Sequence, residues 1–236
     1  ALPAGGNALN FDGVNDLVEI SNETRFDFTT AMTVEAWVRV SSFTREWQTI
    51  VAKGDNSWRL SRERSGNRLE FAVSTPGGTR VVTGNLNVND GKWHHVAATF
   101  DGTSIRLFVD GVLENTTTFA TTTISNSDFN VSIGQNLQQT NRLWHGSIDE
   151  VRIWNQALGE DAIRQSMLAP VNGNESGLIA AYDFNQGVAD GANTGITSLT
   201  NKTATSGLNG ELKNFGLSST TSVSYTHLTL PTNREV

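Results

Sequence analysis

The stretch Gly146-Ser-Ile-Asp-Glu-Val-Arg-Ile-Trp-Asn155 decides the fold, because taking its residues alternately gives two distinct sets of side chains. Successive side chains of a β-strand point to opposite faces of a sheet, so this period of two predicts a long strand. Both faces carry large apolar or charged side chains that pack against or pair with other residues, which favours a position in the middle of a sheet. The predicted faces are Ile148, Glu150, Arg152 and Trp154 on one side, and Asp149, Val151 and Ile153 on the other.

A second stretch, residues 33–40, alternates in the same way and predicts another strand. If the two strands lie in one sheet, carboxylate, guanidinium and indole groups meet across them, and each favourable pair contributes about 0.2–1 kcal/mol. This polar face has two interpretations: a structural network covered by a helix, or an exposed platform for a sugar. The predicted faces of residues 33–40 are Val34, Ala36, Val38 and Val40 on one side, and Glu35, Trp37 and Arg39 on the other.

The rest of the chain reads as short strands separated by turn residues, with one helix. Asp101-Gly102 and Asp110-Gly111 are strong hairpin signals. Residues 159–168 alone have helical spacing, with acids in the first turn and Pro170 after the end. Strands at short regular spacing with one short helix predict an all-β sandwich, because an α/β fold needs a helix between successive strands.

Composition narrows the class of protein. The 236 residues suffice for one large β domain with a core, and the absence of Cys excludes disulfides and thiolate metal sites. A net charge of −7 argues against sequence-independent nucleic-acid binding, which needs a basic surface. No apolar run approaches the length of a membrane span, so membrane insertion is not expected.

Three motifs together resemble a known family. They are the stretch quoted above, residues 91–102 (Gly-Lys-Trp-His-His-Val-Ala-Ala-Thr-Phe-Asp-Gly) and the opening Phe11-Asp-Gly-x-x-Asp16. In combination they resemble the laminin-G-like jelly rolls of the concanavalin A-like lectin and glucanase superfamily. The resemblance covers about residues 7–168. It implies an antiparallel jelly-roll β-sandwich.

The chain beyond Pro170 contains a pair of strand-like segments, residues 177–185 and 207–215. In many laminin-G-like domains a similar pair precedes the Phe-Asp-Gly opening, whereas here it follows the body. We expect residues 177–216 to supply strands or edge cover for the same sandwich, within one domain of residues 1–223; the start of a second, truncated copy is the alternative. Residues 224–236 resemble a translated cloning or sequencing adapter and are set aside.

The resemblance implies a structural calcium ion. In the related laminarinase-type hydrolases, the aspartate matching Asp149 contacts Ca²⁺ beside carbonyl groups of the opening strand, and Ca²⁺ prefers such oxygen ligands. Asp12, Asp16 and Asp149 are therefore the predicted metal ligands. The alternative is structural: Asp149 caps a neighbouring turn and Asp12 makes an Asx-turn.

Catalysis is not expected. The same hydrolases carry Glu-x-Asp-x-x-Glu or Glu-x-Asp-x-Glu on one strand, so that two carboxylates face one cleft. Here Ser147 stands in place of the first Glu, and Val151 and Arg152 in place of the second. His94 and His95 follow a Trp in a predicted strand, beside no nucleophile motif, and are expected to be buried.

Carbohydrate binding fits the resemblance better. A sugar presents apolar C–H faces to aromatic rings and hydroxyl groups to polar side chains. Trp47 and Trp58, each flanked by charged residues, and the polar loop 136–145 meet this requirement, with ordinary rim packing as the alternative for both indoles. The candidate carbohydrate-binding residues are Trp47, Trp58, Arg59, Asn136, Arg142 and His145.

These observations predict a secreted or cell-surface module that binds a poly- or oligosaccharide, or an extracellular protein, without catalysis. One rival class is a structural or adhesive module of a larger surface protein, whose contacts are with other proteins. Another is a polysaccharide hydrolase with an unfamiliar site. The fold alone does not decide among them.

Overall fold

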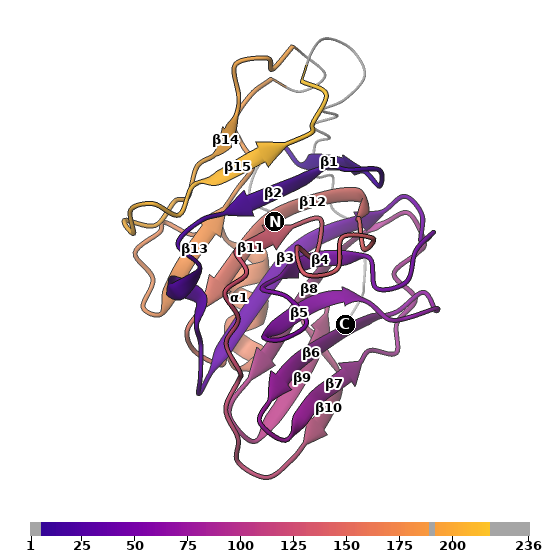
Figure 1. Ribbon diagram of the computed structural model, residues 1–236, viewed down its shortest axis with the longest axis vertical. Helices are drawn as coiled ribbons and strands as arrows, with labels where there is room; N and C mark the ends of the chain where they lie inside the picture. Colours follow the sequence, from indigo (N-terminus) through magenta and orange to yellow (C-terminus); the bar gives the residue numbers. More distant parts are fainter. Residues whose placement is uncertain (1–5, 189–191, 218–236) are drawn as a thin grey trace.

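The computed structural model describes residues 6–188 and 192–217, and these form two antiparallel β-sheets packed face to face (Figure 1). One sheet has the order β1-β12-β3-β8-β9-β10, with β13 also paired to β12. The other has the order β14-β15-β2-β11-β4-β5-β6-β7. The predicted all-β, antiparallel jelly-roll sandwich with one short helix is confirmed.

The elements have the following bounds. The first sheet contains β1 (Leu9–Asp12), β3 (Met32–Val40), β8 (Trp93–Phe100), β9 (Ser104–Val109), β10 (Val112–Thr118), β12 (His145–Trp154) and β13 (Leu178–Tyr182). The second contains β2 (Leu17–Ile20), β4 (Thr49–Ala52), β5 (Trp58–Arg62), β6 (Leu69–Thr75), β7 (Gly78–Thr83), β11 (Val131–Ile133), β14 (Ser198–Leu199) and β15 (Gly210–Lys213). A 3₁₀ helix, η1 (Glu23–Phe26), and the helix α1 (Glu160–Leu168) complete the described part of the chain.

Strand β3 has the faces that its sequence predicts. Val34, Ala36, Val38 and Val40 all lie in the main hydrophobic core between the sheets. Trp37 points to the other side, where it packs with different residues. The period of two therefore holds along this strand, because the inner faces of a sandwich alternate with the outer ones.

Strand β12 departs from strict alternation. Ile148, Val151 and Ile153 all lie in the main core, although the sequence pattern placed Ile148 on the opposite face. Opposite β3, the register slips by one residue between Asp149 and Arg152, and Glu150 has a φ of 49°. This is a β-bulge, in which one extra residue reverses the phase of the side chains that follow. The predicted faces of β12 are therefore wrong on the N-terminal side of the bulge.

The bulge coincides with a change of neighbour. On the edge of β12 away from β3, β1 pairs with residues 145–148 and β13 with residues 151–154. Between these two partners lie Asp149 and Glu150, which pair with neither. We call this interruption of the ladder the β12 gap.

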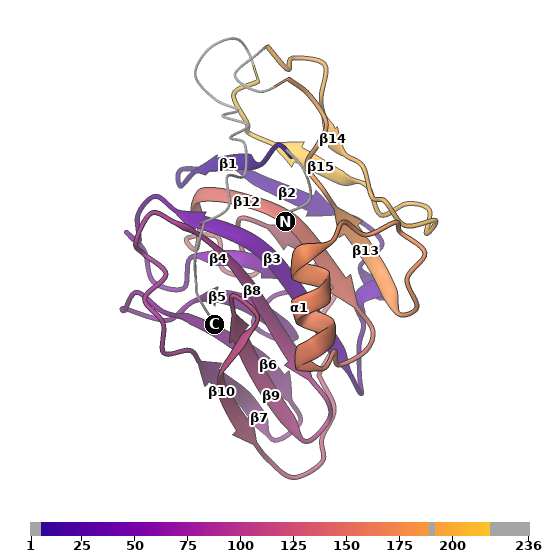
Figure 2. The same cartoon turned by 180° about the vertical axis from the view of Figure 1, so that it is seen from behind.

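Helix α1, predicted over residues 159–168, is confirmed and lies against the outer face of the first sheet (Figure 2). Its Ile163 packs on Ala97 and Phe108 of the sheet. Its Ser166 hydroxyl donates a hydrogen bond of 2.5 Å to Glu35 of β3. Arg152 of β12 donates to the Ser166 carbonyl at 2.5 Å and to the Ala169 carbonyl at 3.0 Å.

The polar face shared by β3 and β12 is thus a structural network beneath α1. Arg152 pairs with Glu150 at 2.8 Å, and the Trp154 indole donates to Glu35 at 3.0 Å. Burial alone raises the pKa of Glu35, but His95, Arg152 and Ser166 outweigh it and hold that pKa below its usual range. The alternative of an exposed sugar platform here is wrong, because the helix covers these side chains.

Residues 177–217 add strands to both sheets. β13 pairs with β12 in the first sheet, whereas β15 pairs with β2 and β14 with β15 in the second. The set of residues that this segment contributes to the main core is Ala180, Tyr182, Phe184, Leu199, Leu208 and Phe215. The segment set aside as an adapter, residues 224–236, lies outside the described residues.

Candidate functional site

The loop between β3 and β4 is held in a fixed shape by buried polar side chains. The side-chain carbonyl of Gln48 accepts hydrogen bonds from the backbone N–H groups of Thr44 at 2.6 Å and Arg45 at 2.9 Å. From the other side, Arg62 donates to the Arg45 carbonyl at 2.5 Å. Gln48 and Arg62 are both buried. The loop is therefore positioned by the body of the sandwich.

Trp47 lies in this loop with a φ of 51°, a left-handed backbone conformation that bulky residues rarely adopt. Such strain costs about 1–3 kcal/mol and concentrates at binding sites, where the surroundings over-determine the backbone. The Arg142 guanidinium lies 4.7 Å from the centre of the Trp47 ring, and that of Arg64 lies 5.5 Å from it. Cation–π attraction to both guanidiniums orients the half-buried indole.

Three of the predicted carbohydrate-binding residues converge on one carboxylate oxygen, Asp55 Oδ1. Arg142 donates to this atom at 2.6 Å, the Asn136 amide at 2.9 Å, and Arg59 approaches it at 3.3 Å. The convergence arises because the loop between β11 and β12 reaches back to the turn between β4 and β5. Trp47 joins this group through its contact with Arg142.

Glu70 extends the group on the second sheet. Arg59 pairs with Glu70 at 2.9 Å as well as with Asp55. Burial raises the pKa of Glu70, and the neighbouring Arg59 opposes that rise without cancelling it. The predicted residues Arg59, Asn136 and Arg142 are therefore partly structural, because they hold the Trp47 loop and the β11–β12 loop on the sheet.

A cleft of about 450 Å³ opens beside this group. Its volume falls within the range of small-molecule sites, which bury an apolar face of the ligand and bind its polar groups by a few placed donors and acceptors. We call it the Trp47 cleft, and it is lined by Thr44, Arg45, Glu46, Trp47, Gln139, Asn141 and Arg142.

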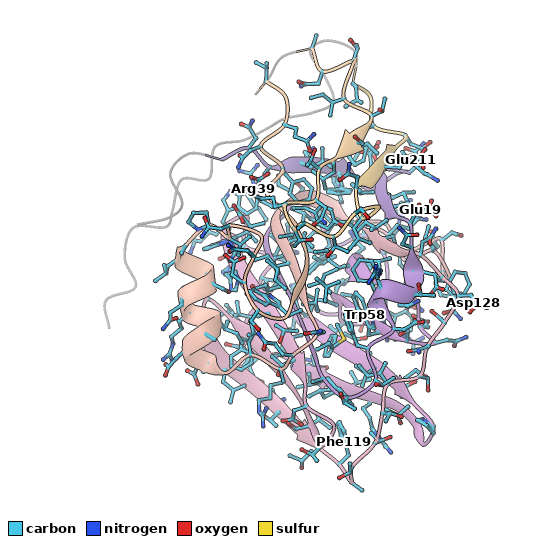
Figure 3. All side chains as sticks on the ribbon, turned by 90° about the vertical axis from the view of Figure 1, so that its left-hand side faces the viewer. Glu19, Arg39, Trp58, Phe119, Asp128 and Glu211 are labelled. Carbon is cyan, nitrogen blue, oxygen red and sulfur yellow. The ribbon has the colours of Figure 1, made fainter. Side chains whose placement is uncertain are left out.

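A second hollow of about 420 Å³ lies at the other side of the β4–β5 turn. Gln138 connects the two regions, because its side-chain carbonyl accepts a hydrogen bond of 3.0 Å from the backbone of Asn56. The exposed ring of Phe129 and the outward-lying Asp128 belong to this hollow (Figure 3). The sequence prediction missed it, although an aromatic residue inside an Asn/Ser/Asp-rich loop is a signal of this kind of site.

Trp58 is not at the rim. Its side chain is 1% exposed, packs against Phe28 at 6.4 Å between ring centres, and donates its indole N–H to the Phe26 carbonyl at 3.4 Å. Figure 3 labels it among the interior side chains. The expectation that Trp58 is exposed is wrong, because β5 turns Trp58 and Leu60 into the core and leaves Arg59 on the outer face.

His145 lies apart from the Asp55 group. It is half-buried at the start of β12, where its Nδ1 lies 2.8 Å from the Ser42 hydroxyl and its backbone pairs with Asp12 of β1. The structure therefore places His145 beside Asp12, one of the predicted metal ligands. It does not line the Trp47 cleft.

The three predicted metal ligands do not form one site. Leu9 lies opposite Ile148 and Asp12 opposite His145, which sets Asp12 about four residues, or roughly 13 Å, from Asp149 along the ladder. Across residues 6–188 and 192–217, no group of three His, Cys, Asp or Glu side chains is arranged to hold a metal ion. The expectation of a joint site is therefore wrong.

Asp12 and Asp16 have structural contacts instead. Asp12 Oδ1 accepts the backbone N–H of Val14 at 2.7 Å, which is the Asx-turn considered above. Asp16 is buried and accepts the backbone N–H of Asp12 at 3.0 Å. Burial, with a smaller contribution from the Asp12 charge, raises the pKa of Asp16 to about 7.

Asp149 occupies the β12 gap and is 1% exposed. Its Oδ1 accepts the backbone N–H of Glu150 at 2.7 Å, whereas its Oδ2 is buried without a hydrogen-bond partner among the described residues. Burial, followed by the charge of Glu150, raises the pKa of Asp149 well above its usual range. An unpartnered buried carboxylate oxygen favours either a proton or a cation.

A family comparison accounts for the fold. The laminin-G family of the concanavalin A-like lectin/glucanases superfamily matches residues 12–164, which is more than half of the chain. The chain belongs to this superfamily, and the predicted resemblance is confirmed. No curated protein matches the sequence significantly.

Solved structures share the fold at low identity. A Bacteroides ovatus protein described as a candidate carbohydrate-binding protein is 22% identical, with a TM-score of 0.71 over 92% of this chain and 61% of its own. The CBM40 domain of a Ruminococcus gnavus sialidase, bound to α2,3-sialyllactose, is 14% identical, with a TM-score of 0.54 over 71% of this chain and 100% of its own. A domain of an extracellular arabinanase from Geobacillus stearothermophilus, in complex with arabinotriose, is 19% identical, with a TM-score of 0.50 over 68% of this chain and 76% of its own.

The chain thus spans 61% of the length of the Bacteroides ovatus protein. At these identities the likeness establishes the fold, and it does not carry a ligand from one protein to another. Within the described residues, no helix is long and apolar enough to cross a membrane.

Proposed function

We propose that this protein is a non-catalytic, extracellular module that binds a poly- or oligosaccharide in the Trp47 cleft. The observation that carries the proposal is the indole of Trp47, held at a strained backbone position as one wall of a cleft whose other walls are polar. The C–H face of a pyranose packs on such a ring, while the side chains of Gln139, Asn141 and Arg142 bind its hydroxyl groups.

The structural neighbours support a glycan as the ligand. Two of them, the sialidase domain and the arabinanase domain, are described in complex with oligosaccharides, and the latter comes from an extracellular enzyme. These similarities support sugar binding and an extracellular location. The residues of the Trp47 cleft supply the independent physical argument.

The burial of Glu35 and Glu150 beneath α1 supports the proposal that the protein is not a glycosidase. Glu35 and Glu150 both lie near Arg152 beneath α1, and Glu35 is 0% exposed. A glycosidase needs two carboxyl groups that face the substrate across one cleft. These two side chains cannot reach a polysaccharide while the helix covers them.

A glycan array tests the binding proposal. We expect the wild-type protein to bind a defined group of oligosaccharides. Trp47→Ala should lose that binding, because the substitution removes the indole wall of the cleft and leaves the core intact. Val112→Ala, at an exposed position of β10, is the control and should bind like the wild type. A flat array with concentration-dependent self-association would favour the adhesive alternative, and turnover of a β-glucan would favour the hydrolase.

We further propose that a calcium ion is bound at the β12 gap. The buried, unpartnered Oδ2 of Asp149 would be the one carboxylate ligand, with backbone carbonyls and water supplying the rest, and the charge of the ion would relieve the unfavourable burial of Asp149 beside Glu150. The ion would stabilise the junction of β1 and β13 with β12. Asp12 and Asp16 are not part of this site, because their contacts close the turn after β1.

Removal of the metal gives a direct prediction. A chelator should lower the melting temperature of the wild-type protein, because an ion that binds only the folded state stabilises it. Asp149→Asn should abolish this response. An unchanged melting temperature, together with no calcium in the purified protein by elemental analysis, would contradict the site.

A further inference from the structure

Arginine side chains are concentrated around the Trp47 cleft, in a chain whose net charge is −7. Five guanidiniums lie in or next to the cleft, and the carboxylates that pair with them are Glu46, Asp55 and Glu70. Glu63, whose charge also acts on Arg62, is itself paired with Arg68, so among the described residues the arginines of this region exceed its carboxylates by two. The five arginines are Arg45, Arg59, Arg62, Arg64 and Arg142.

Three of these arginines already have a carboxylate partner. Arg59 and Arg142 pair with Asp55, and Arg64 pairs with Glu46 at 3.2 Å. Their charges are largely compensated inside the protein. They orient Trp47 and the loops rather than offering an uncompensated charge to a ligand.

Arg45 and Arg62 have no carboxylate partner within 4 Å among the described residues. Arg62 is buried beneath the loop and donates to the carbonyls of Arg45 and Gly66. Arg45 is half-buried, lines the cleft, and donates only to the neutral side-chain carbonyl of Asn141. Arg45 is thus the guanidinium that is both accessible from the cleft and uncompensated.

A guanidinium matches a carboxylate better than it matches an amide. Its planar array of N–H groups forms two parallel hydrogen bonds to the two carboxylate oxygens, and charge-assisted bonds of this kind are about twice as strong as neutral ones. The bond from Arg45 to Asn141 has a charged donor but an uncharged acceptor, so a carboxylate would add a second hydrogen bond and an ionic attraction that Asn141 does not supply. Asn141 is exposed and can turn its amide to a sugar hydroxyl.

We infer that the ligand is an acidic oligosaccharide, whose carboxylate binds Arg45 while an adjoining sugar ring packs on Trp47. This inference rests on the proposed function, since it specifies the chemistry of the glycan in the same cleft. The excess of positive charge attracts such a ligand over distances of several ångströms, and salt weakens this attraction. Uronic acids and sialic acids both supply the carboxylate.

Matched pairs of acidic and neutral ligands test the inference. Calorimetric titrations would compare trigalacturonic acid with its methyl ester, α2,3-sialyllactose with lactose, and a sulfated carrageenan oligosaccharide, which has no carboxylate, with the other acids. We expect at least one carboxylate ligand to bind about tenfold or more tighter than its neutral counterpart. Comparison of the two carboxylate pairs distinguishes a uronic acid from a sialic acid.

Two variants assign the effect to Arg45. Arg45→Gln should weaken binding of the acidic member of the pair much more than binding of the neutral member, and so remove the preference. Arg106→Gln makes the same change of charge in β9 of the other sheet and should bind like the wild type. Equal melting temperatures of the three proteins show that folding is not the cause.

The outcomes separate the inference from the proposed function. Equal affinity for acidic and neutral ligands, with loss of both in Trp47→Ala, overturns the inference and retains the proposed function. A preference confined to the sulfated oligosaccharide also overturns it, because the bidentate carboxylate contact is then not what the cleft selects. Absence of binding to every glycan overturns both.

Discussion

The carboxyl group of Asp16 lies in an environment that disfavours its ionised form. It is buried in the turn between β1 and β2, and burial raises its pKa from 3.8 to about 7. The folded protein therefore binds the proton more tightly than the unfolded chain. This tighter proton binding adds its full contribution to the free energy of unfolding at pH values below the pKa of Asp16 in the unfolded chain. The contribution is lost as the pH rises through about 7.

Asp16→Asn isolates this effect, because asparagine keeps an acceptor for the Asp12 N–H but cannot ionise. We expect the variant to match the wild type at acidic pH and to become more stable than it as the pH rises. The difference should grow by at most about 1.4 kcal/mol per pH unit across this window. Urea denaturation at several pH values measures it; a difference that does not change with pH would contradict the assignment.

At this scale the sequence supports some residue assignments and not others. Trp47, Arg59, Asn136 and Arg142 could be grouped from their polar surroundings, and the structure brings them together around Asp55. Trp58 has equally polar neighbours in the sequence, but its face is decided by the pairing of β5 with β4 and β6. Local composition contains no information about that pairing.

Among the elements, β12 and α1 form a unit that depends on one arginine. Arg152 crosses from the strand to the helix and lies between Glu35 and Glu150, with a side chain that is almost wholly buried. Without Arg152, Glu150 loses its buried cationic partner, and Glu35 keeps only His95 and its hydrogen-bond donors. Breaking such a pair costs about 3–5 kcal/mol.

Arg152→Met should therefore lower the free energy of unfolding by about 3–5 kcal/mol. Lys92→Met is the matched control, because the Lys92–Asp90 pair is exposed and should contribute at most about 1 kcal/mol. Equilibrium urea denaturation of both variants gives the comparison. Equal stability of the two would mean that α1 is not held through Arg152.

Element type was predictable wherever the pattern was regular. The hairpins at Asp101-Gly102 and Asp110-Gly111, the strand β3 and the helix α1 all follow from local signals. The bulge in β12 was not, because it is a slip of the β12–β3 register that coincides with the change from β1 to β13 on the other edge of the strand. These pairings are tertiary contacts between segments far apart in the chain.

For the whole molecule, residues 177–217 are part of the sandwich. They pair with β12 in one sheet and with β2 in the other, and they bury Tyr182, Phe184 and Leu208 in the main core. Without them, two strand edges and part of the core become exposed to water. Exposed edges of this kind also promote aggregation.

A chain that ends at Ser176 should therefore be insoluble or lack a cooperative thermal transition. A chain that ends at Leu217 retains every described element and serves as the control. Circular dichroism during heating measures both. An unchanged melting temperature for the shorter chain would show that residues 177–217 are not needed by the sandwich and would favour a second, truncated copy.

The overall class was within reach of the sequence, because the strand motifs specify the superfamily and the alternation specifies a sandwich. The cleft was not, because it forms where the β3–β4 and β11–β12 loops meet. Its strained Trp47 and its uncompensated Arg45 become visible only in three dimensions. Binding surfaces built from loops commonly have this property.

The most direct test of the account follows the indole N–H signals of the six tryptophans by nuclear magnetic resonance during titration with the tightest binder from the glycan array. We predict that the Trp47 signal, assigned with Trp47→Phe, shifts most, while the signals of the buried Trp58 and Trp144 stay in place. Saturation of the protein with an unchanged Trp47 signal would contradict the central claim that this cleft binds the sugar.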